Sequence, residues 1–192
     1  MMDKTLIVVT GLPGAGKSTV SNLIMEEYNL PVISMGDCVR EEARKRGIKE
    51  DAKSMQEFIV ELRRKYGPGI VAELTTKKIE KLNQKFIVVD GLRSKEELEI
   101  FKRNFKRILL LVIVASIEKR LKRLLMRHRV DDPKTLEELK ARDEVELNIG
   151  LREVTNDNNS IRIENEGDLQ ELKQNVREIM EKLEIQKMQT EV

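Results

Sequence analysis

The sequence is poor in the residues that build disulfides, soft-metal sites and aromatic cores. Its 192 residues include one cysteine, one histidine and no tryptophan, and aromatic residues make up 3% of the total. A single cysteine, Cys38, excludes an intrachain disulfide, and one cysteine with one histidine, His128, cannot form a zinc cage. Any metal site must therefore use oxygen ligands, which favours Mg²⁺, and the core must be aliphatic.

Charge of one sign and long apolar runs are also missing. The 36 Lys and Arg residues nearly balance the 34 Asp and Glu residues, so the formal net charge of +2 does not indicate a purely electrostatic nucleic-acid binder. The longest uninterrupted apolar run, residues 108–115, is far shorter than the roughly 18 residues that span a bilayer. The first residues lack the features of a signal peptide. We therefore expect a cytoplasmic protein that does not bind membranes; a nucleic-acid partner and the oligomeric state stay open.

Apolar runs of strand length alternate along the chain with longer helical segments. The expected strands are residues 5–9, 31–34, 85–89, 107–115 and 160–163. Most are near-continuous aliphatic runs, which is typical of parallel strands that helices cover on both faces. We predict an α/β protein with a three-layer αβα fold and a five-stranded parallel sheet. A single domain would cover residues 1–185, followed by a frayed tail at 186–192.

The segment between the second and third expected strands is longer than one crossover helix requires. Apolar residues recur at helical spacing from Met55 to Tyr66, and Gly67-Pro68-Gly69 ends that helix. We predict a helical insertion at about 36–84. Because large insertions of this kind often grip a substrate, it is a candidate acceptor-binding lobe.

A basic segment, Lys119–Arg129, follows the fourth expected strand. Its arginines recur every three or four residues beside an apolar face of leucines, and Asp131-Asp132-Pro133 closes it. Spacing alone does not separate arginines that face a ligand from arginines that face solvent. Near the end of the chain, apolar residues at helical spacing over 169–183 predict a helix docked on the sheet.

The strongest local signal is a glycine-rich loop between the first strand and the first helix. Residues 11–18 read Gly-Leu-Pro-Gly-Ala-Gly-Lys-Ser, which fits G-x-x-x-x-G-K-[ST]. Glycines allow successive backbone N–H groups to point at one anion, and the helix adds the positive end of its dipole. The residues predicted to bind a nucleotide are Gly11, Leu12, Pro13, Gly14, Ala15, Gly16, Lys17, Ser18 and Thr19.

Three residues at the end of this loop have separate predicted tasks. Lys17 neutralises the β and γ phosphates and is therefore a catalytic candidate. Ser18 coordinates Mg²⁺ through its hydroxyl, and Thr19 reaches the α phosphate. The predicted cofactors are accordingly ATP and Mg²⁺.

A magnesium nucleotide site also needs a carboxylate at the carboxyl edge of the sheet. Asp90 directly follows the apolar run 86–89 and precedes Gly91, so it lies where ligands of open α/β sheets bind. We assign Asp90 to Mg²⁺ through water. The alternative is a residue that only starts a turn or caps the helix near Ser94.

With these motifs in place, the chain resembles P-loop kinases of the nucleoside monophosphate kinase group. The loop is similar to the Gly-x-Pro-Gly-x-Gly-Lys start of adenylate kinase, and residues 33–40 resemble its Ser-Thr-Gly-Asp-Met-Leu-Arg stretch. Residues 90–93 resemble its Asp-Gly-Phe-Pro-Arg segment with one residue fewer, and residues 163–169 resemble the Asn-x-Gly-x-Leu segment of dephospho-CoA kinase. The whole arrangement looks closest to an archaeal family of adenylate-kinase-related, dephospho-CoA-kinase-like proteins whose acceptor is unassigned.

The resemblance implies roles for residues outside the loop. The residues that it places at the acceptor are Gly36, Arg40 and Arg93, and Arg93 is also a catalytic candidate. The residues that it places beside the adenine are Asn165 and Gly167. The catalytic arginines that it implies in and after a short helical lid, at about 118–142, are Arg127, Arg129 and Arg142. The sequence departs from the family pattern before Arg93, where one residue fewer is expected to shift the guanidinium by a few ångströms.

Asp37 separates two kinase hypotheses. A phosphate acceptor is already anionic and needs no base, whereas a hydroxyl acceptor, as in dephospho-CoA, benefits from a carboxylate within hydrogen-bond reach. Asp37 is therefore either a catalytic general base or the N-cap of the helix that begins there.

Together these features predict a Mg-ATP-dependent phosphotransferase whose acceptor is a nucleotide or nucleotide-like small molecule. The alternative is an ATP-operated switch or assembly ATPase that acts on a protein or RNA partner, as the basic segment Lys119–Arg129 suggests. The sequence contains no Asn-Lys-x-Asp motif for guanine recognition, which favours adenine.

Overall fold

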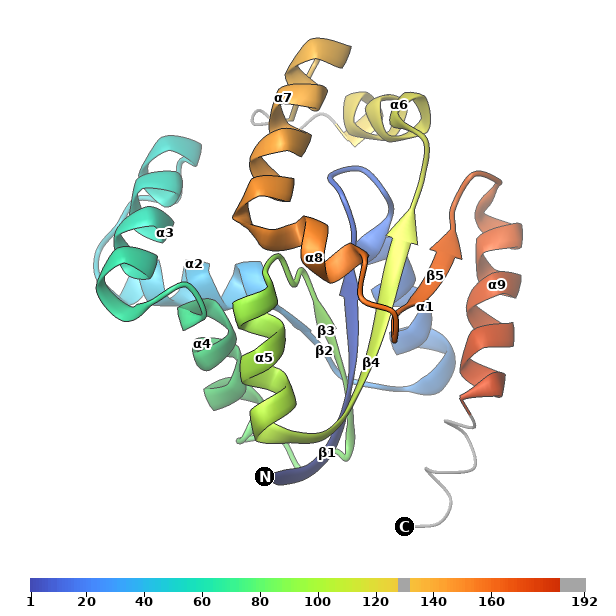
Figure 1. Ribbon diagram of the computed structural model, residues 1–192, viewed down its shortest axis with the longest axis horizontal. Coiled ribbons are helices and arrows are strands. Elements are labelled where there is room, and N and C mark those ends of the chain that lie inside the picture. The colour runs from blue at the N-terminus through green and yellow to red at the C-terminus, as the bar shows by residue number, and fades with distance from the viewer. Residues whose placement is uncertain (128–131, 184–192) are drawn as a thin grey trace.

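The computed structural model describes residues 1–127 and 132–183, and within these ranges five strands form one parallel sheet (Figure 1). The strands are β1 (Met2–Thr10), β2 (Val32–Ser34), β3 (Phe86–Asp90), β4 (Phe105–Val114) and β5 (Ile161–Glu164). Their order across the sheet is β2-β3-β1-β4-β5. The predicted α/β fold with a parallel sheet of this size is confirmed, and strand boundaries differ from the predicted ones by a few residues at most.

Helices cover both faces of the sheet and rise above its carboxyl edge (Figure 1). They are α1 (Lys17–Tyr28), α2 (Met35–Lys45), α3 (Ala52–Tyr66), α4 (Ile70–Ile79), α5 (Lys95–Asn104), α6 (Ile117–Arg127), α7 (Leu136–Glu146), α8 (Arg152–Thr155) and α9 (Leu169–Lys182). A short π-helical segment, η1 (Leu147–Leu151), joins α7 to α8. Within the described ranges, none of these helices could cross a membrane.

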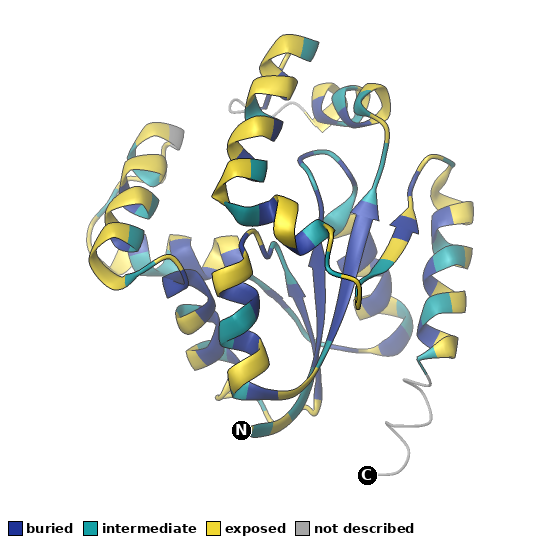
Figure 2. Cartoon of the chain, in the orientation of Figure 1, coloured by how far each residue is buried: buried dark blue, intermediate teal, exposed yellow. Residues whose placement is uncertain are grey.

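Alternating side chains of the central strands enter two different layers. In β1, Leu6 and Val8 pack into the core beneath α2 to α5, and Ile7 and Val9 pack into the core beneath α1 and α9. The central strands are buried over most of β3 and over the second halves of β1 and β4, and the first residues of β1 and β4 include exposed ones (Figure 2). The edge strands β2 and β5 are only partly buried. An edge strand has a neighbour on one side only, so it is less completely covered than the central strands.

The C-terminal helix α9 docks as predicted on the α1 layer of the sheet. Its side chains Leu172, Val176 and Met180 belong to the same core cluster as the strand residues of that face. Leu169, which the same periodicity placed on the apolar face, is exposed at the helix start. Helical spacing therefore predicted the packed face correctly except at its first residue.

Between β2 and β3 the chain forms α2, α3 and α4, which together extend from one side of the sheet (Figure 1). Helix α3 ends at Tyr66, where Gly67 adopts a φ of 95°. Phe58 and Leu62 are buried, but Tyr66 is 45% exposed. Tyr66 instead lies 5.5 Å from the Arg46 guanidinium. The apolar face predicted for this helix therefore ends one turn early.

Candidate nucleotide-binding site

The phosphate loop, residues 11–18, connects β1 to α1 at the carboxyl edge of the sheet. Gly11, Gly14 and Gly16 have φ angles of 144°, 78° and 102°, which L side chains rarely adopt. Space is restricted as well, because a Cβ on Gly14 would lie 2.7 Å from the carbonyl oxygen of Arg120. The three glycines therefore allow the backbone to curve, and Gly14 also allows the loop to pack closely against α6.

Lys17 folds back over the loop. Its Nζ donates hydrogen bonds to the carbonyl oxygens of Gly11 (2.8 Å) and Leu12 (3.1 Å). Burial above all, together with the positive charge of Arg93, lowers the pKa of Lys17 to about 8. A bound phosphate would favour the charged ammonium, so the position suits a group that binds an anion.

Ser18 and Asp90 meet where the ends of two neighbouring strands lie side by side. Residue Val9 of β1 pairs with Asp90 of β3, and the Ser18 hydroxyl donates to Asp90 Oδ2 over 2.9 Å. The other carboxylate oxygen, Oδ1, is buried and has no hydrogen-bond partner among the described residues. Burial raises the pKa of Asp90. A hydroxyl beside an unsatisfied carboxylate oxygen is the donor set that a hard divalent cation prefers, so these residues fit the Mg²⁺ of a bound nucleotide.

The alternative role proposed for Asp90, a helix cap, is wrong. Ser94 caps α5, because its Oγ accepts a hydrogen bond from the backbone N–H of Glu97 at 3.3 Å. Thr19, the remaining polar residue of the motif, lies exposed near the start of α1. The local motif thus brings Lys17, Ser18 and Asp90 to one edge of the sheet, as the sequence predicted.

Side chains from α6 and from the segment after β5 contact the back of the phosphate loop. Arg120 Nη1 donates to the Pro13 carbonyl at 3.1 Å, and the same guanidinium forms a two-pronged pair with Asp143 of α7 at 2.8 and 2.6 Å. Arg120 is buried, unlike an arginine on a solvated helix face. No local pattern indicates Asp143, which lies among several charged residues of α7.

Asn165, predicted to lie beside the adenine, hydrogen-bonds the loop in this structure. Its Nδ2 donates to the Ala15 carbonyl at 2.7 Å, and its Oδ1 accepts from Arg123 Nη2 at 3.1 Å. Gly167 follows, and a Cβ there would overlap the carboxylate of Glu171. The segment therefore braces the phosphate loop through Asn165, whereas the exposed Glu171 side chain can move aside, so packing alone does not require glycine at 167.

On the insertion side, Arg40 binds a carboxylate of its own helix. Arg40 Nη2 lies 2.5 Å from Asp37 Oδ1, and both side chains are about half exposed, at 46% and 54%. A Cβ on Gly36 would lie 3.6 Å from this guanidinium. The negative charge of Asp37 also contributes to the raised pKa of Asp90. The structure thus brings together Gly36, Asp37 and Arg40 on the side of the site that carries Asp90.

The N-cap role considered for Asp37 is wrong. Helix α2 begins at Met35, and Ser34 is its cap, since the Ser34 Oγ accepts from the Asp37 backbone N–H at 3.2 Å. The helix starts two residues earlier than expected because β2 ends directly at that serine. The carboxylate of Asp37 is therefore not used in capping.

Arg93 is held from two directions. Its Nη1 donates to Glu146 Oε1 of α7 at 2.7 Å, and its backbone N–H donates to Glu97 Oε2 at 2.9 Å. The other oxygen of Glu97 accepts from Arg63 of α3 at 3.1 Å. Burial raises the pKa of Glu97. The pattern Ser-x-x-Glu at 94–97 is a capping-box signal that could have identified Glu97, but no local pattern indicates Glu146.

The lid arginines converge on Asp132, a buried carboxylate between α6 and α7. Arg127 Nε donates to Asp132 Oδ2 at 2.8 Å, and Arg142 Nη1 lies 3.9 Å from Asp132 Oδ1. Arg127 is close enough to Lys17 for its charge to lower the Lys17 pKa. Arg129 and His128 lie outside the described residues. The two described arginines thus share one acidic partner at the open end of the site.

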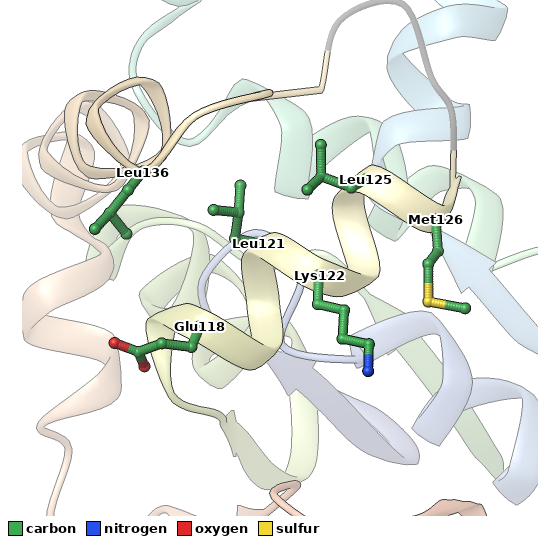
Figure 3. Close-up of a pocket in the computed structure, with 6 residues that line it drawn as sticks. All are labelled: Glu118, Leu121, Lys122, Leu125, Met126 and Leu136. Carbon is green, nitrogen blue, oxygen red and sulfur yellow. The ribbon is translucent and has the colours of Figure 1, made fainter.

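A separate apolar hollow lies on another face of α6 (Figure 3). Its lining residues are Glu118, Leu121, Lys122, Leu125, Met126 and Leu136. Of the leucines predicted to form the apolar face of this helix, only Leu124 is buried, and Leu125 is 44% exposed. Helix α6 therefore turns Arg120, Arg123 and Leu124 to the phosphate loop and other side chains to the hollow, so the hollow is distinct from the phosphate site.

The fold and the phosphate loop define a P-loop nucleotide-binding domain. A family model described as an AAA domain matches residues 10–140, more than half of the chain. The UPF0200 protein of Pyrococcus furiosus is 42% identical over 153 residues, which cover 78% of this chain and 82% of that protein. The UPF0200 protein of Methanothermobacter thermautotrophicus is 37% identical over 182 residues, which cover 95% and 92%. The chain belongs to this AAA domain family and to the UPF0200 family.

A solved structure supports the fold assignment. The crystal structure of TT1252 from Thermus thermophilus superposes with a TM-score of 0.66 over 94% of this chain and 98% of that chain. The two sequences are 19% identical, so the likeness concerns the fold.

Proposed function

We propose that the chain is a cytoplasmic Mg-ATP-dependent phosphotransferase that transfers the γ-phosphoryl group to a nucleotide or nucleotide-like small molecule. The observation that carries this proposal is the meeting of the phosphate loop with the end of β3, where the Ser18 hydroxyl donates to Asp90 Oδ2 at 2.9 Å. Arg93 follows Asp90 in the same segment, and its positive charge adds to burial in lowering the pKa of Lys17. A donor site of P-loop type and a cation from a second segment therefore face the same space, as phosphoryl transfer requires.

On the donor side, the proposal assigns binding and charge neutralisation to the phosphate loop. The amides of the loop and the Lys17 ammonium would hold the β and γ phosphates. Ser18 and Asp90 would hold Mg²⁺, which when bound neutralises phosphate oxygens. Phosphoryl transfer depends mainly on positioning and charge stabilisation, so these contacts would supply most of the donor-side catalysis.

On the acceptor side, Arg40 and Arg93 are the candidate ligands of an anionic acceptor. Each is half exposed and paired with a carboxylate, Asp37 or Glu146. An acceptor phosphate can take over the Arg40–Asp37 pairing because an exposed ion pair contributes only about 0–1 kcal/mol, whereas Glu146 is buried and would lose its partner if Arg93 left it. If the acceptor is a hydroxyl instead, Asp37 is the carboxylate available as a base.

The lid arginines complete the proposed site. Arg127 and Arg142 would release Asp132 and contact the transferring phosphoryl group, together with Arg129, which lies outside the described residues. Cations that approach only when both substrates are bound stabilise the transition state and exclude water.

The test is a transfer assay with γ-labelled ATP and Mg²⁺ against nucleoside monophosphates, dephospho-CoA and nucleosides. We expect label in at least one acceptor, dependence on Mg²⁺, and loss of transfer in Lys17→Ala. The matched control is Lys102→Ala, which removes an exposed lysine that pairs with Glu99 and Asp157 away from the loop. Hydrolysis of ATP by folded protein without transfer to any acceptor would contradict the proposal and favour an ATP-operated switch.

A further inference from the structure

The back of the phosphate loop rests directly on α6. Gly14 packs so closely that an added Cβ would lie 2.7 Å from the backbone oxygen of Arg120 and 3.0 Å from Leu124 Cγ. The Arg120 side chain reaches the same loop, since its Nη1 donates to the Pro13 carbonyl at 3.1 Å. Arg120 therefore contacts the loop through both its backbone and its guanidinium.

The direction of a carbonyl determines the direction of the next amide. In a trans peptide the C=O and N–H groups point in opposite directions. A Pro13 carbonyl directed at Arg120 therefore turns the Gly14 N–H away from α6, toward the concave side of the loop. Asn165 acts in the same sense, because its bond to the Ala15 carbonyl at 2.7 Å turns the Gly16 N–H to that side.

Arg120 is itself immobilised by Asp143. The two guanidinium nitrogens donate to the two carboxylate oxygens at 2.8 and 2.6 Å, and the side chains are only 5% and 11% exposed. The pair is neutral overall, so Arg120 contributes a fixed direction more than a net charge. Apolar residues of similar volume often stabilise a protein as much as a buried ion pair does. Stability alone therefore does not account for the Arg120–Asp143 pair. The same guanidinium donates a third hydrogen bond, to the Pro13 carbonyl of the loop. The pair can therefore hold that carbonyl in one direction.

We propose that Arg120, held in place by Asp143, is a positioning residue that orients the amides of the phosphate loop toward a bound polyphosphate. It acts through the Pro13–Gly14 peptide and does not touch the ligand. The inference rests on the phosphate loop being the donor site. It also links α7 to phosphate binding, since Asp143 lies on that helix.

The experiment measures binding by calorimetry, with Mg-ADP, sodium tripolyphosphate and adenosine as probes. Arg120→Lys keeps the positive charge but cannot hold both Asp143 and the Pro13 carbonyl with a planar fork. We expect about fivefold to tenfold weaker binding of Mg-ADP and tripolyphosphate, by the same factor, as lost hydrogen-bond orientation implies. Asp143→Asn keeps Arg120 but loosens it, and we expect about threefold weaker binding of both probes.

The matched control is Arg177→Lys. Arg177 forms a similar two-pronged pair with Glu27, at 2.9 and 2.9 Å, between α9 and the far end of α1. This variant should bind all probes as the wild type does. A second readout is the amide NMR signal of Gly14, which should shift in Arg120→Lys and in Asp143→Asn but not in the control.

The outcomes separate this inference from the proposed function. Wild-type affinity for Mg-ADP and tripolyphosphate in folded Arg120→Lys and Asp143→Asn would overturn the positioning role alone. A loss confined to adenosine or to the nucleoside part of ADP would also overturn it. If Arg120→Lys does not fold, unchanged affinity in Asp143→Asn is sufficient to overturn it. Failure of the wild-type chain to bind either polyphosphate would overturn the donor site and this inference together.

Discussion

The two sides of the site are held by different kinds of contact. On the phosphate-loop side, Arg120 and Asn165 are buried and hydrogen-bond loop carbonyls at 3.1 and 2.7 Å. On the insertion side, the side chains of Arg40 and Arg93 are 46% and 49% exposed and pair with carboxylates. The proposed donor side therefore has its contacts before a ligand arrives, whereas on the proposed acceptor side the exposed Arg40–Asp37 pair is one that a ligand can replace.

This difference has a physical consequence for substrate binding. Buried hydrogen bonds pre-organise the loop, so little ordering is needed when a polyphosphate binds. Exposed ion pairs contribute about 0–1 kcal/mol each, so exchanging a carboxylate for an acceptor anion costs little. Substitutions in the loop should therefore affect the nucleotide donor, and substitutions at the exposed arginines should affect the acceptor.

Lys17→Ala should cause the largest loss on the donor side. We expect at least about tenfold weaker ATP binding, because a charge-assisted phosphate contact is removed. The loss should occur with and without Mg²⁺, and circular dichroism should show an intact fold. Wild-type affinity for ATP in this variant, measured by calorimetry, would be incompatible with a P-loop donor site.

Asp90→Asn should cause a smaller loss that depends on the metal. We expect about fivefold weaker ADP binding in the presence of Mg²⁺ and no change in its absence, since one carboxylate oxygen of the donor set becomes an amide. Titration of ADP with and without EDTA measures the difference. An equal loss under both conditions would assign Asp90 to the phosphates or to the fold instead of the metal.

Arg40→Ala should leave the donor side almost unchanged. We expect the KM of the acceptor to rise about tenfold, through loss of a charged phosphate contact, while the KM of ATP stays within about twofold. Arg46→Ala, at the C-cap of the same helix, removes an arginine paired with Glu42 and serves as the control. Equal changes in the KM of the acceptor and the KM of ATP would contradict the assignment of Arg40 to the acceptor side. They would also contradict the proposed difference between the two sides.

Glu97 is a buried carboxylate on the insertion side, and its effect should appear in the pH dependence of stability. Burial raises its pKa above the ordinary 4.5, so the folded chain binds its proton more tightly than the unfolded chain does. The free energy of unfolding of the wild type, minus that of Glu97→Gln, should therefore be greatest below about pH 4.5 and fall as the pH rises through the folded pKa.

Urea denaturation of both proteins at several pH values from 4.5 to 7 measures this difference. A pH-independent difference, or one that grows with pH, would contradict the buried carboxylate described for Glu97. The subtraction removes the contributions of other carboxylates, which are common to both proteins.

Much of the fold followed from local patterns. The strand runs, the loop at 11–18 and Asp90 were identified from neighbouring residues, because an aliphatic run or a glycine loop has its physical meaning within a few positions. Tyr66 shows the limit of the same reasoning. It continues the helical spacing of α3, but the core beneath the helix ends before it, so the residue is exposed.

The contacts around the loop and the arginines were predicted less well. Ser34 was overlooked as the cap of α2 because the start of that helix depends on where β2 ends. Asp143 and Glu146 were overlooked because each lies in a charged run in which every residue is an equally good candidate for the surface. Their partners Arg120 and Arg93 are distant in the sequence, and no spacing rule connects them.

By itself the sequence determined the phosphate loop and the alternation of strands with helices, because consecutive amides can converge on one anion and consecutive side chains alternate across a sheet. Only the tertiary structure decided which of the many arginines brace the loop, which pair with carboxylates near the insertion, and which residue caps α2. Those choices depend on how α6 and α7 pack above the carboxyl edge, and packing brings together residues whose separation in sequence carries no information about their contact.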